Sequence, residues 1–169
     1  MALANLVALF AIALLIMGCA TTNTSGDASA GGRSTGPRTP QEATDGFYSA
    51  LQAMFRGDAE PMKNAWWHDD EAVYMGPGGD YRIGWSDIAD EWDRQASRNL
   101  GGKVEPTRLH FVDGGDFALL TCMETGTNEV DGRTTTVSLR TSTVFLRRDG
   151  VWKAISHQSD TLPYLETSD

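Results

Sequence analysis

His157 and Arg140 are the two residues of this sequence best suited to acid–base and electrostatic chemistry. An imidazole can accept or donate a proton near neutral pH, and a guanidinium can stabilise a negative oxygen. If Asp149-Gly150 forms a two-residue hairpin turn, counting back along the two strands places Ser142 opposite His157. The same count places Arg140 opposite Ser159, so all four side chains would share one face of a sheet. We therefore predict that this face binds an anionic or carbonyl-bearing ligand.

This prediction depends on the strand register, because a slip of one residue would send the pair to the opposite face. A polar sheet position at which the imidazole of His157 only hydrogen-bonds a neighbour is the alternative. Glu124 is the other candidate base. With a two-residue turn at Asp131-Gly132 it opposes Leu139, on the face away from Arg140.

Aromatic and soft side chains that could form a pocket wall are Trp67, Tyr74, Met75 and Trp92. Tyr74 also offers a hydroxyl group. The alternative is that some of the four are ordinary core residues. The segment Trp66–Glu71 combines an imidazole with carboxylates, which suits a metal ion, but adjacent residues rarely converge on one ion. We therefore predict neither a metal site nor a cofactor.

The first helix that must support such a site has a clear start signal. Thr39 can cap it, Pro40 fits the first helical position, and Glu42 completes a capping box. Apolar residues at helical spacing continue to Met54, and Gly57 supplies a left-handed stop. The folded domain is therefore predicted to begin at about Pro40.

Shorter elements follow this helix. Asp58 can cap a second helix that ends at Trp66. Two short strands, Ala72–Met75 and Tyr81–Ile83, flank a turn rich in glycine and proline. Ser86 can then cap a third helix.

Four long strands are predicted after Lys103. They are joined at Gly114-Gly115, Asp131-Gly132 and Asp149-Gly150, dipeptides that favour tight hairpins. Three helices followed by an antiparallel meander indicate an α+β fold in which helices cover one face of the sheet. No repeat and no second domain is indicated, so residues 40–169 are predicted to form one domain.

Several short segments occur in a diagnostic order and spacing. They are Tyr48–Leu51, Met54–Asp58, Tyr74–Pro77, Gly84-Trp85, Arg140–Phe145 and Trp152–Ser159. Through them the chain resembles the SnoaL-like domain family of the nuclear transport factor 2-like superfamily. The resemblance implies a cone-shaped α+β fold with three N-terminal helices packed on a curved, mainly antiparallel sheet. It also implies a pocket between helices and sheet, and a homodimer formed through the sheet.

The superfamily that this chain resembles includes isomerases, cyclases, dehydratases, epoxide hydrolases and non-catalytic proteins, so the resemblance assigns no reaction. In its ketosteroid isomerases a catalytic Asp follows the first short strand, whereas the matching stretch here is Val73-Tyr74-Met75-Gly76. Proton transfer of that kind would therefore need His157 or Glu124 instead.

The N-terminal segment has the character of an export signal. From Leu3 to Met17 every residue except Asn5 is apolar, a run that suits a signal peptide better than a membrane span. It ends at Cys19 in a sequence that resembles a bacterial lipobox, which predicts a lipoprotein signal over residues 1–19. Cleavage after Ala20 to give a soluble periplasmic or secreted protein is the alternative. Residues 20–39 lack apolar periodicity and are predicted to be a flexible tether.

Charge and cysteine content narrow the function further. Fourteen Lys and Arg against 23 Asp and Glu give a net charge of −9, which makes nucleic acid a poor partner. Cys122 is the only cysteine besides Cys19, so the domain has no internal disulfide partner. We predict a cell-envelope module, anchored to the membrane by a lipid, that binds a small, partly apolar ligand. An enzyme of the isomerase, cyclase, dehydratase or hydrolase kind using His157 with Arg140, and a dimeric interaction domain without catalysis, are the alternatives.

Overall fold

The computed structural model describes residues 35–130 and 132–161, and Cys19 with the predicted signal and most of the tether lies outside them. The described part contains three helices and six strands. In chain order they are α1 (Pro40–Met54), α2 (Glu60–Asn64), β1 (Val73–Met75), β2 (Tyr81–Ile83), α3 (Trp85–Ser97), β3 (Lys103–Asp113), β4 (Phe117–Val130), β5 (Arg133–Arg148) and β6 (Val151–Asp160).

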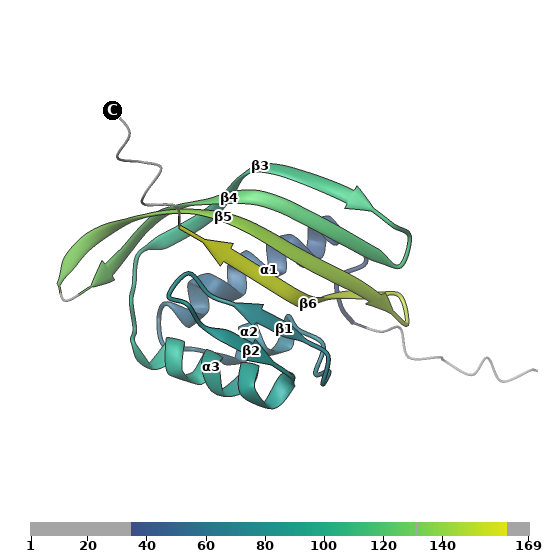
Figure 1. The fold of residues 1–169 in the computed structure, drawn as a ribbon, viewed down its shortest axis with the longest axis horizontal. Coiled ribbons are helices and arrows are strands. Elements are labelled where there is room, and N and C mark those ends of the chain that lie inside the picture. Colours follow the sequence, from purple (N-terminus) through teal and green to yellow (C-terminus); the bar gives the residue numbers. More distant parts are fainter. Residues whose placement is uncertain (1–34, 131, 162–169) are drawn as a thin grey trace, which may run out of the picture. The chain divides into compact units, whose positions relative to one another are not determined.

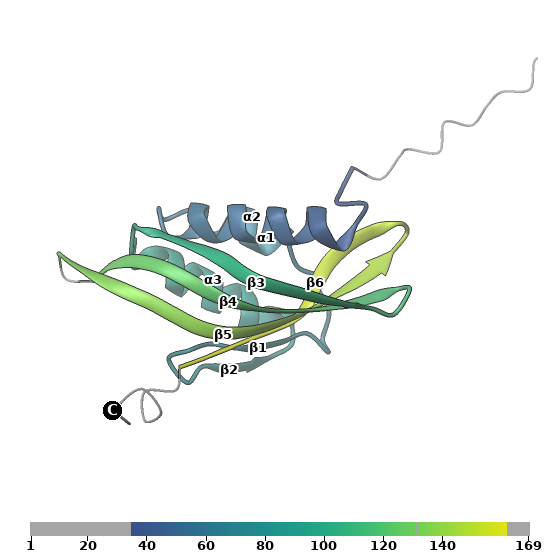
Figure 2. The same ribbon diagram turned by 90° about the horizontal axis from the view of Figure 1, so that it is seen from above.

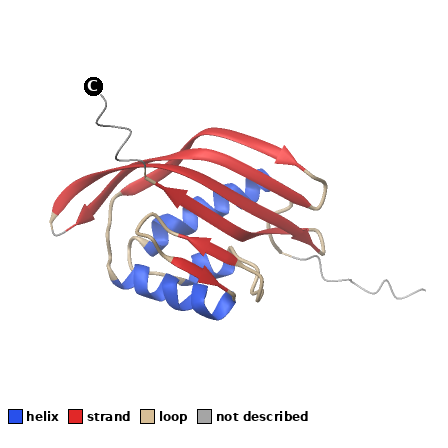
Figure 3. Cartoon of the chain, in the orientation of Figure 1, coloured by secondary structure: helices blue, strands red, loops and turns tan. Residues whose placement is uncertain are grey.

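The strands form one curved sheet in the order β2-β1-β6-β5-β4-β3 (Figure 1). Every neighbouring pair is antiparallel except β1 and β6, which are parallel. Figure 2 shows α1 running along one side of this sheet, and Figure 3 shows α3 next to the short strand β2. The prediction of an α+β fold with three helices on a mainly antiparallel sheet is therefore confirmed.

Helix α1 begins as predicted, with one difference at its cap. The Thr39 hydroxyl accepts a hydrogen bond from the Glu42 amide at 3.1 Å, and Pro40 is the first helical residue. The Glu42 carboxylate accepts from the amide of Arg38 at 2.6 Å, not from that of Thr39 as a capping box requires. Gly57 has a φ of 92°, the left-handed conformation expected after a helix.

The start of the domain reaches a little further back than predicted. The carbonyl of Pro37, inside the predicted tether, accepts a hydrogen bond from the amide of Trp152 at 2.9 Å. The guanidinium of Arg38 also lies against Gly150, in the turn between β5 and β6. The last residues before α1 are therefore packed on the sheet.

The two shorter helices differ from their predicted limits. Helix α2 ends at Asn64 and not at Trp66, which instead forms an isolated bridge with Ala154 of β6. Helix α3 begins at Trp85, so Ser86 lies inside it and provides no cap. The cap position is Gly84, whose φ of 85° suits glycine and whose amide donates to Ala72. These contacts turn the chain into the helix before Ser86.

Two of the three hairpin turns of the long strands were predicted correctly, but the turn at Gly114-Gly115 and the register of β6 were not. Asp113 pairs with Ala118, so four residues and not two lie between the paired ends of β3 and β4. Arg148 pairs with Val151 and Val130 pairs with Arg133, as two-residue turns require. Within β6, however, Ala154 pairs with Phe145 and Ser156 pairs with Val144. Ile155 is therefore an extra residue that forms a β-bulge.

The bulge at Ile155 overturns the predicted pairing of His157 and Arg140. His157 pairs with Thr143 and not with Ser142, and Arg140 pairs with Asp160 and not with Ser159. Because side chains alternate along a strand, one extra residue sends His157 and Ser159 to the face opposite that of Arg140 and Ser142. The proposed pair of His157 and Arg140 is therefore wrong.

The core fills the space between the helices and the concave face of the sheet. Its largest buried side chains come from both layers and include Phe47, Met54, Met62, Trp66, Ile88, Trp92, Leu120 and Phe145. The ring of Phe47 on α1 lies edge-on to that of Phe145 on β5 at 6.4 Å between centroids. Among the described residues, none of the helices is long and apolar enough to cross a membrane.

Candidate functional site

A cavity of about 160 Å³ remains between the helices and the concave face of the sheet. Its apolar wall includes Phe47, Leu51, Met62, Trp92, Val137 and Leu139, and its polar groups include Tyr74, Gln95, Glu124, Asn128, His157 and Ser159. An apolar protein cavity of about 150 Å³ can hold benzene. This cavity therefore has the size for a single ring and polar groups that could orient a substituent.

His157 and Glu124 are the two buried titratable groups that face each other in this cavity. Nε2 of His157 lies 3.9 Å from Oε1 of Glu124, too far for a direct hydrogen bond. Nδ1 of His157 is 2.9 Å from the hydroxyl oxygen of Thr143, its partner across the strands. The imidazole also lies between aromatic rings, 5.0 Å from Phe47 and 6.1 Å from Tyr74 between centroids.

Burial drives both groups toward their uncharged forms. It lowers the pKa of His157 to about 4, because a charged imidazolium would lose its hydration. Burial also raises the pKa of the Glu124 carboxyl, and the hydrogen bond from Tyr48 opposes this only in part. At neutral pH the imidazole is therefore a free base, and the same burial raises the pKa of the carboxyl group beside it. Such pairs are typical of acid–base sites, although structural pairs also show such shifts.

Tyr48 on α1 holds the Glu124 carboxyl in place. Its hydroxyl donates to Oε1 of Glu124 at 2.9 Å, and the Cys122 sulfur lies 3.3 Å from the same hydroxyl. Burial raises the pKa of Tyr48, with the nearby Glu124 adding to the effect, so the phenol remains a donor. One oxygen of Glu124 is thus fixed beside His157.

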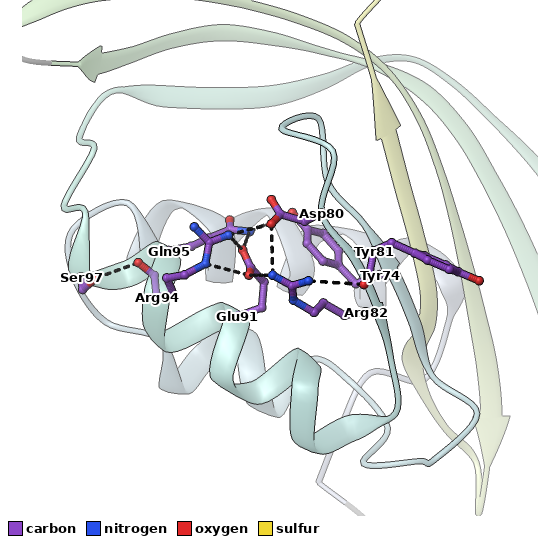
Figure 4. Close-up of polar contacts among 8 residues, drawn as sticks. All are labelled: Tyr74, Asp80, Tyr81, Arg82, Glu91, Arg94, Gln95 and Ser97. Atoms are coloured by element: carbon purple, nitrogen blue, oxygen red, sulfur yellow. Dashed lines mark hydrogen bonds and ion pairs between the residues drawn. The ribbon is translucent and has the colours of Figure 1, made fainter.

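Next to His157, on the neighbouring strand β1, the Tyr74 hydroxyl joins a polar network that leads to the surface (Figure 4). Nε2 of Gln95 lies 2.9 Å from the Tyr74 hydroxyl and 2.7 Å from Oε1 of Glu91. Glu91 is also paired with Arg82 at 3.3 Å and with Arg94, whose Nε donates to Oε2 at 2.9 Å. Burial alone would raise the pKa of Glu91, but the hydrogen bonds from Arg94 and Gln95 outweigh it and lower the pKa. Glu91 is therefore a buried carboxylate.

Half of the residues predicted for the site line the cavity. They are His157, Tyr74, Trp92 and Ser159. The indole nitrogen of Trp92 is buried without a hydrogen-bond partner in the described structure.

The other predicted residues lie elsewhere. Arg140 and Ser142 line a shallow depression on the opposite face of the sheet. Met75 lies on this opposite face as well, because successive side chains of a strand alternate and Tyr74 faces the cavity. Its partner across the strands is Gln158, which lines the depression. Trp67 donates its indole hydrogen to the Leu146 carbonyl at 3.0 Å. Its ring has Arg148 at 5.2 Å and Lys153 at 5.3 Å from the centroid.

Glu124, Gln95 and Tyr48 are the polar residues that sequence reasoning did not bring together. The predicted pairing of Glu124 with Leu139 is confirmed, as is its position on the face away from Arg140. The uninterrupted register places His157 on the Arg140 face, so it separates His157 from Glu124. The one sequence signal for the bulge is the adjacent apolar pair Ala154-Ile155, where strict alternation would require a polar residue.

The acidic segment after Trp66 makes protein contacts. Asp69 accepts from Arg148 at 2.7 Å, and the His68 ring stacks on Trp85 with 3.8 Å between centroids. Within residues 35–130 and 132–161, no three His, Cys, Asp or Glu side chains lie close enough to share a metal ion.

Three solved structures illustrate what the fold is similar to. One from Streptomyces avermitilis, named provisionally as a dehydratase of the nuclear transport factor 2-like family, has a TM-score of 0.63 and 22% identity, covering 72% of this chain and 92% of its own. A second, named provisionally as an aromatic ring hydroxylase of Novosphingobium aromaticivorans, has a TM-score of 0.61 and 20% identity, with coverages of 72% and 85%. A nuclear transport factor 2-like superfamily protein of Salmonella enterica has a TM-score of 0.62 and 18% identity, with coverages of 76% and 96%. At these identities the likeness shows the fold alone.

Sequence comparison identifies the family. A search of the curated proteins finds no match. The family model described as the SnoaL-like domain matches residues 43–164, a span that includes every strand of the sheet and most of α1. As the resemblance predicted, the chain belongs to the SnoaL-like domain family, and its fold is that of nuclear transport factor 2-like proteins.

Proposed function

We propose that this domain binds a small, partly apolar molecule, about the size of one ring, in the cavity between the helices and the sheet. The observation that carries the proposal is a cavity of about 160 Å³ whose apolar wall is interrupted by the buried pair His157 and Glu124. Apolar walls provide affinity through surface removed from water, and a few polar groups provide orientation. The provisional names of two proteins of this fold, a dehydratase and an aromatic ring hydroxylase, agree with a ligand of this kind.

Titration of the purified protein with phenol, followed by NMR, tests this function. Resonances of cavity residues such as Leu139 should shift in a saturable way, whereas those of Arg140 on the opposite face should not. Leu139→Phe narrows the cavity and should weaken binding at least tenfold. The matched control is Leu119→Phe, a half-buried leucine of β4 that does not line the cavity, and it should bind phenol as the wild type does. Saturable binding that survives Leu139→Phe would contradict this location.

A second candidate function is proton transfer on the bound molecule. It is favoured by the 3.9 Å between Nε2 of His157 and Oε1 of Glu124, which leaves both atoms able to bond a third group. In this proposal the neutral imidazole takes a proton from the ligand, and Glu124, whose raised pKa favours its protonated form, returns one. Glu124 thus replaces Arg140 as the partner of His157.

Hydrogen–deuterium exchange tests the proton-transfer proposal. Cyclohexanone in D2O should exchange the hydrogens next to its carbonyl faster with the protein than without it. His157→Gln and Glu124→Gln should each remove the added rate, while Gln158→Glu, which changes a group on the opposite face, should retain it. No exchange above the protein-free rate would leave binding as the function.

Export and lipid attachment remain proposals that rest on the sequence. The apolar run that ends at Cys19 supports a lipoprotein signal, and Cys19 lies outside the described residues. Mass spectrometry of the mature N-terminus should find a diacylated cysteine, and Cys19→Ala should release the protein from the membrane. A free N-terminus after Ala20 would instead indicate a secreted protein.

A dimeric interaction domain is the third proposal. It is supported by large apolar side chains on β3 and β4 that are exposed in the single chain, among them Leu109, Val112 and Phe117. Light scattering should give twice the monomer mass, and Val112→Lys should reduce it to that of the monomer. A monomer at millimolar concentration would exclude this role.

A further inference from the structure

The Tyr74 hydroxyl has a hydrogen-bond direction that its neighbours impose. Nε2 of Gln95 has two hydrogens and no capacity to accept. One hydrogen serves Oε1 of Glu91 at 2.7 Å and the other serves the Tyr74 oxygen at 2.9 Å. Since Glu91 is a carboxylate that can only accept, the amide of Gln95 cannot be turned the other way round. Tyr74 is therefore the acceptor in its bond with Gln95.

This arrangement leaves the hydroxyl hydrogen of Tyr74 available. Within the described residues, the bond from Gln95 is the only hydrogen bond that the Tyr74 side chain makes. The side chain is 4% exposed and lines the cavity, together with Pro77, Gly78 and Gln95. Burial raises the pKa of Tyr74, so the phenol keeps its hydrogen throughout the physiological range. An acceptor on a ligand in the cavity can take this hydrogen, because a phenol hydroxyl donates one hydrogen bond while it accepts another.

Gly76 keeps the space that the Tyr74 hydroxyl occupies. A Cβ at this position would lie only 2.5 Å from the hydroxyl oxygen. Gly76 is not among the glycines with a positive φ, so its backbone does not require glycine. What requires glycine here is the nearby hydroxyl.

The network behind Tyr74 resists rearrangement. Glu91 is held by Arg82 and Arg94, and both of these also contact Asp80 at the end of the β1–β2 turn (Figure 4). Gln95 is therefore fixed by Glu91, the buried carboxylate of an ionic cluster that reaches the surface, and it in turn fixes the phenol. Donors that are oriented before the ligand arrives lose little freedom on binding.

We propose that Tyr74 is a specificity-determining donor that selects ligands whose ring carries a hydrogen-bond acceptor, of which a ring carbonyl is the simplest. The proposal rests on the proposed function, because it requires a ligand in this cavity. It deepens that function by naming the ligand class: small cyclic ketones and related ring carbonyl compounds, in preference to hydrocarbons of the same shape.

Two probes of nearly identical shape test the proposal, namely cyclohexanone and methylenecyclohexane, in which CH2 replaces the carbonyl oxygen. The dissociation constants of both probes are measured by NMR titration for the wild type, Tyr74→Phe and Gly76→Ala. One neutral hydrogen bond corresponds to a factor of about 3–10 in affinity. Tyr74→Phe should therefore weaken the binding of cyclohexanone by about that factor. The dissociation constant of methylenecyclohexane should change by less than about twofold. The control Tyr81→Phe, at a tyrosine of β2 that is 62% exposed, should change neither.

Gly76→Ala provides a second, independent arm. This substitution keeps the phenol but pushes its oxygen away. Like Tyr74→Phe, it should therefore lower the preference for cyclohexanone over methylenecyclohexane. If Tyr74→Phe and Gly76→Ala both bind the two probes in the wild-type ratio, Tyr74 is not the selecting donor, although the cavity still binds ligands. If the wild type binds neither probe, the proposed function fails and this inference fails with it.

Discussion

At the scale of single residues, the site is defined by His157 and Glu124 and by what burial does to their protons. Among the described residues, the hydrogen-bond partners of both side chains are uncharged: Nδ1 of His157 meets a Thr143 hydroxyl, and the bond that Glu124 accepts from Tyr48 offsets the effect of burial only in part. The lowered pKa of His157 and the raised pKa of Glu124 therefore have a common cause, which is the hydration that both groups lose on burial. Both shifts have consequences for stability, because each side chain regains its ordinary pKa on unfolding.

For His157 the stability should fall toward acid pH. Its pKa is about 6.5 in the unfolded chain and about 4 in the folded protein, so between these values the unfolded chain binds more protons. The contribution is present above about pH 6.5 and lost as the pH falls toward 4, on the order of 3 kcal/mol in the free energy of unfolding. Urea unfolding at about pH 7 and about pH 4 should show a smaller decrease for His157→Gln than for the wild type. An equal decrease would mean that the buried imidazole is charged.

For Glu124 the pH dependence should have the opposite sign. Its raised pKa means that the folded protein retains this proton at pH values where the unfolded chain has lost it. The contribution is present below the unfolded pKa of about 4.5 and lost as the pH rises through the folded pKa. The stability of the wild type relative to Glu124→Gln should therefore decrease from acid toward alkaline pH in the same unfolding series. A relative stability that increases would indicate an ionised carboxylate paired with His157.

At the scale of elements, local signals specified the positions of helices and turns well but could not specify the register of β6. Local signals such as a capping threonine, a stop glycine or a tight-turn dipeptide act within a few residues. The helices and strands that such signals delimit lie close to their predicted limits. The bulge at Ile155 instead reflects how β6 packs between β1 and β5. Since a single extra residue reverses every later side chain, the error moved His157 from one face to the other.

The caps of α1 and α3 provide a matched prediction at this scale. Thr39 accepts a hydrogen bond from the Glu42 amide, so Thr39→Ala should cost about 1 kcal/mol in the free energy of unfolding. Ser86 is exposed within α3 and caps nothing, so Ser86→Ala should change the stability by less than about 0.5 kcal/mol. Thermal and urea unfolding of both variants would check this. Equal losses would mean that Ser86, and not Gly84, marks the start of α3.

At the scale of the whole domain, the cavity is what remains after a straight helix and a curved sheet have packed together. No segment of the sequence predicts its volume, because the lining comes from α1, α2, α3, β1 and the long strands at once. Sequence reasoning could name the family and thereby expect a pocket between helices and sheet. It could also name Tyr74, Trp92 and His157 as site residues, but not that Glu124 and Gln95 line the same cavity or that Tyr48 holds Glu124.

Phe47 and Phe145 allow packing to be separated from ligand selection. Their rings touch and both are buried, yet Phe47 lines the cavity and Phe145 does not. Phe→Ala in a core costs about 3–5 kcal/mol, so Phe→Leu at either site should cost roughly 1–2 kcal/mol. Only Phe47→Leu should enlarge the cavity, and its affinity for indole relative to phenol should rise several-fold in NMR titrations. Because both variants lose similar packing, an equal shift in both would mean that general loosening, and not the cavity wall, sets the size of the ligand.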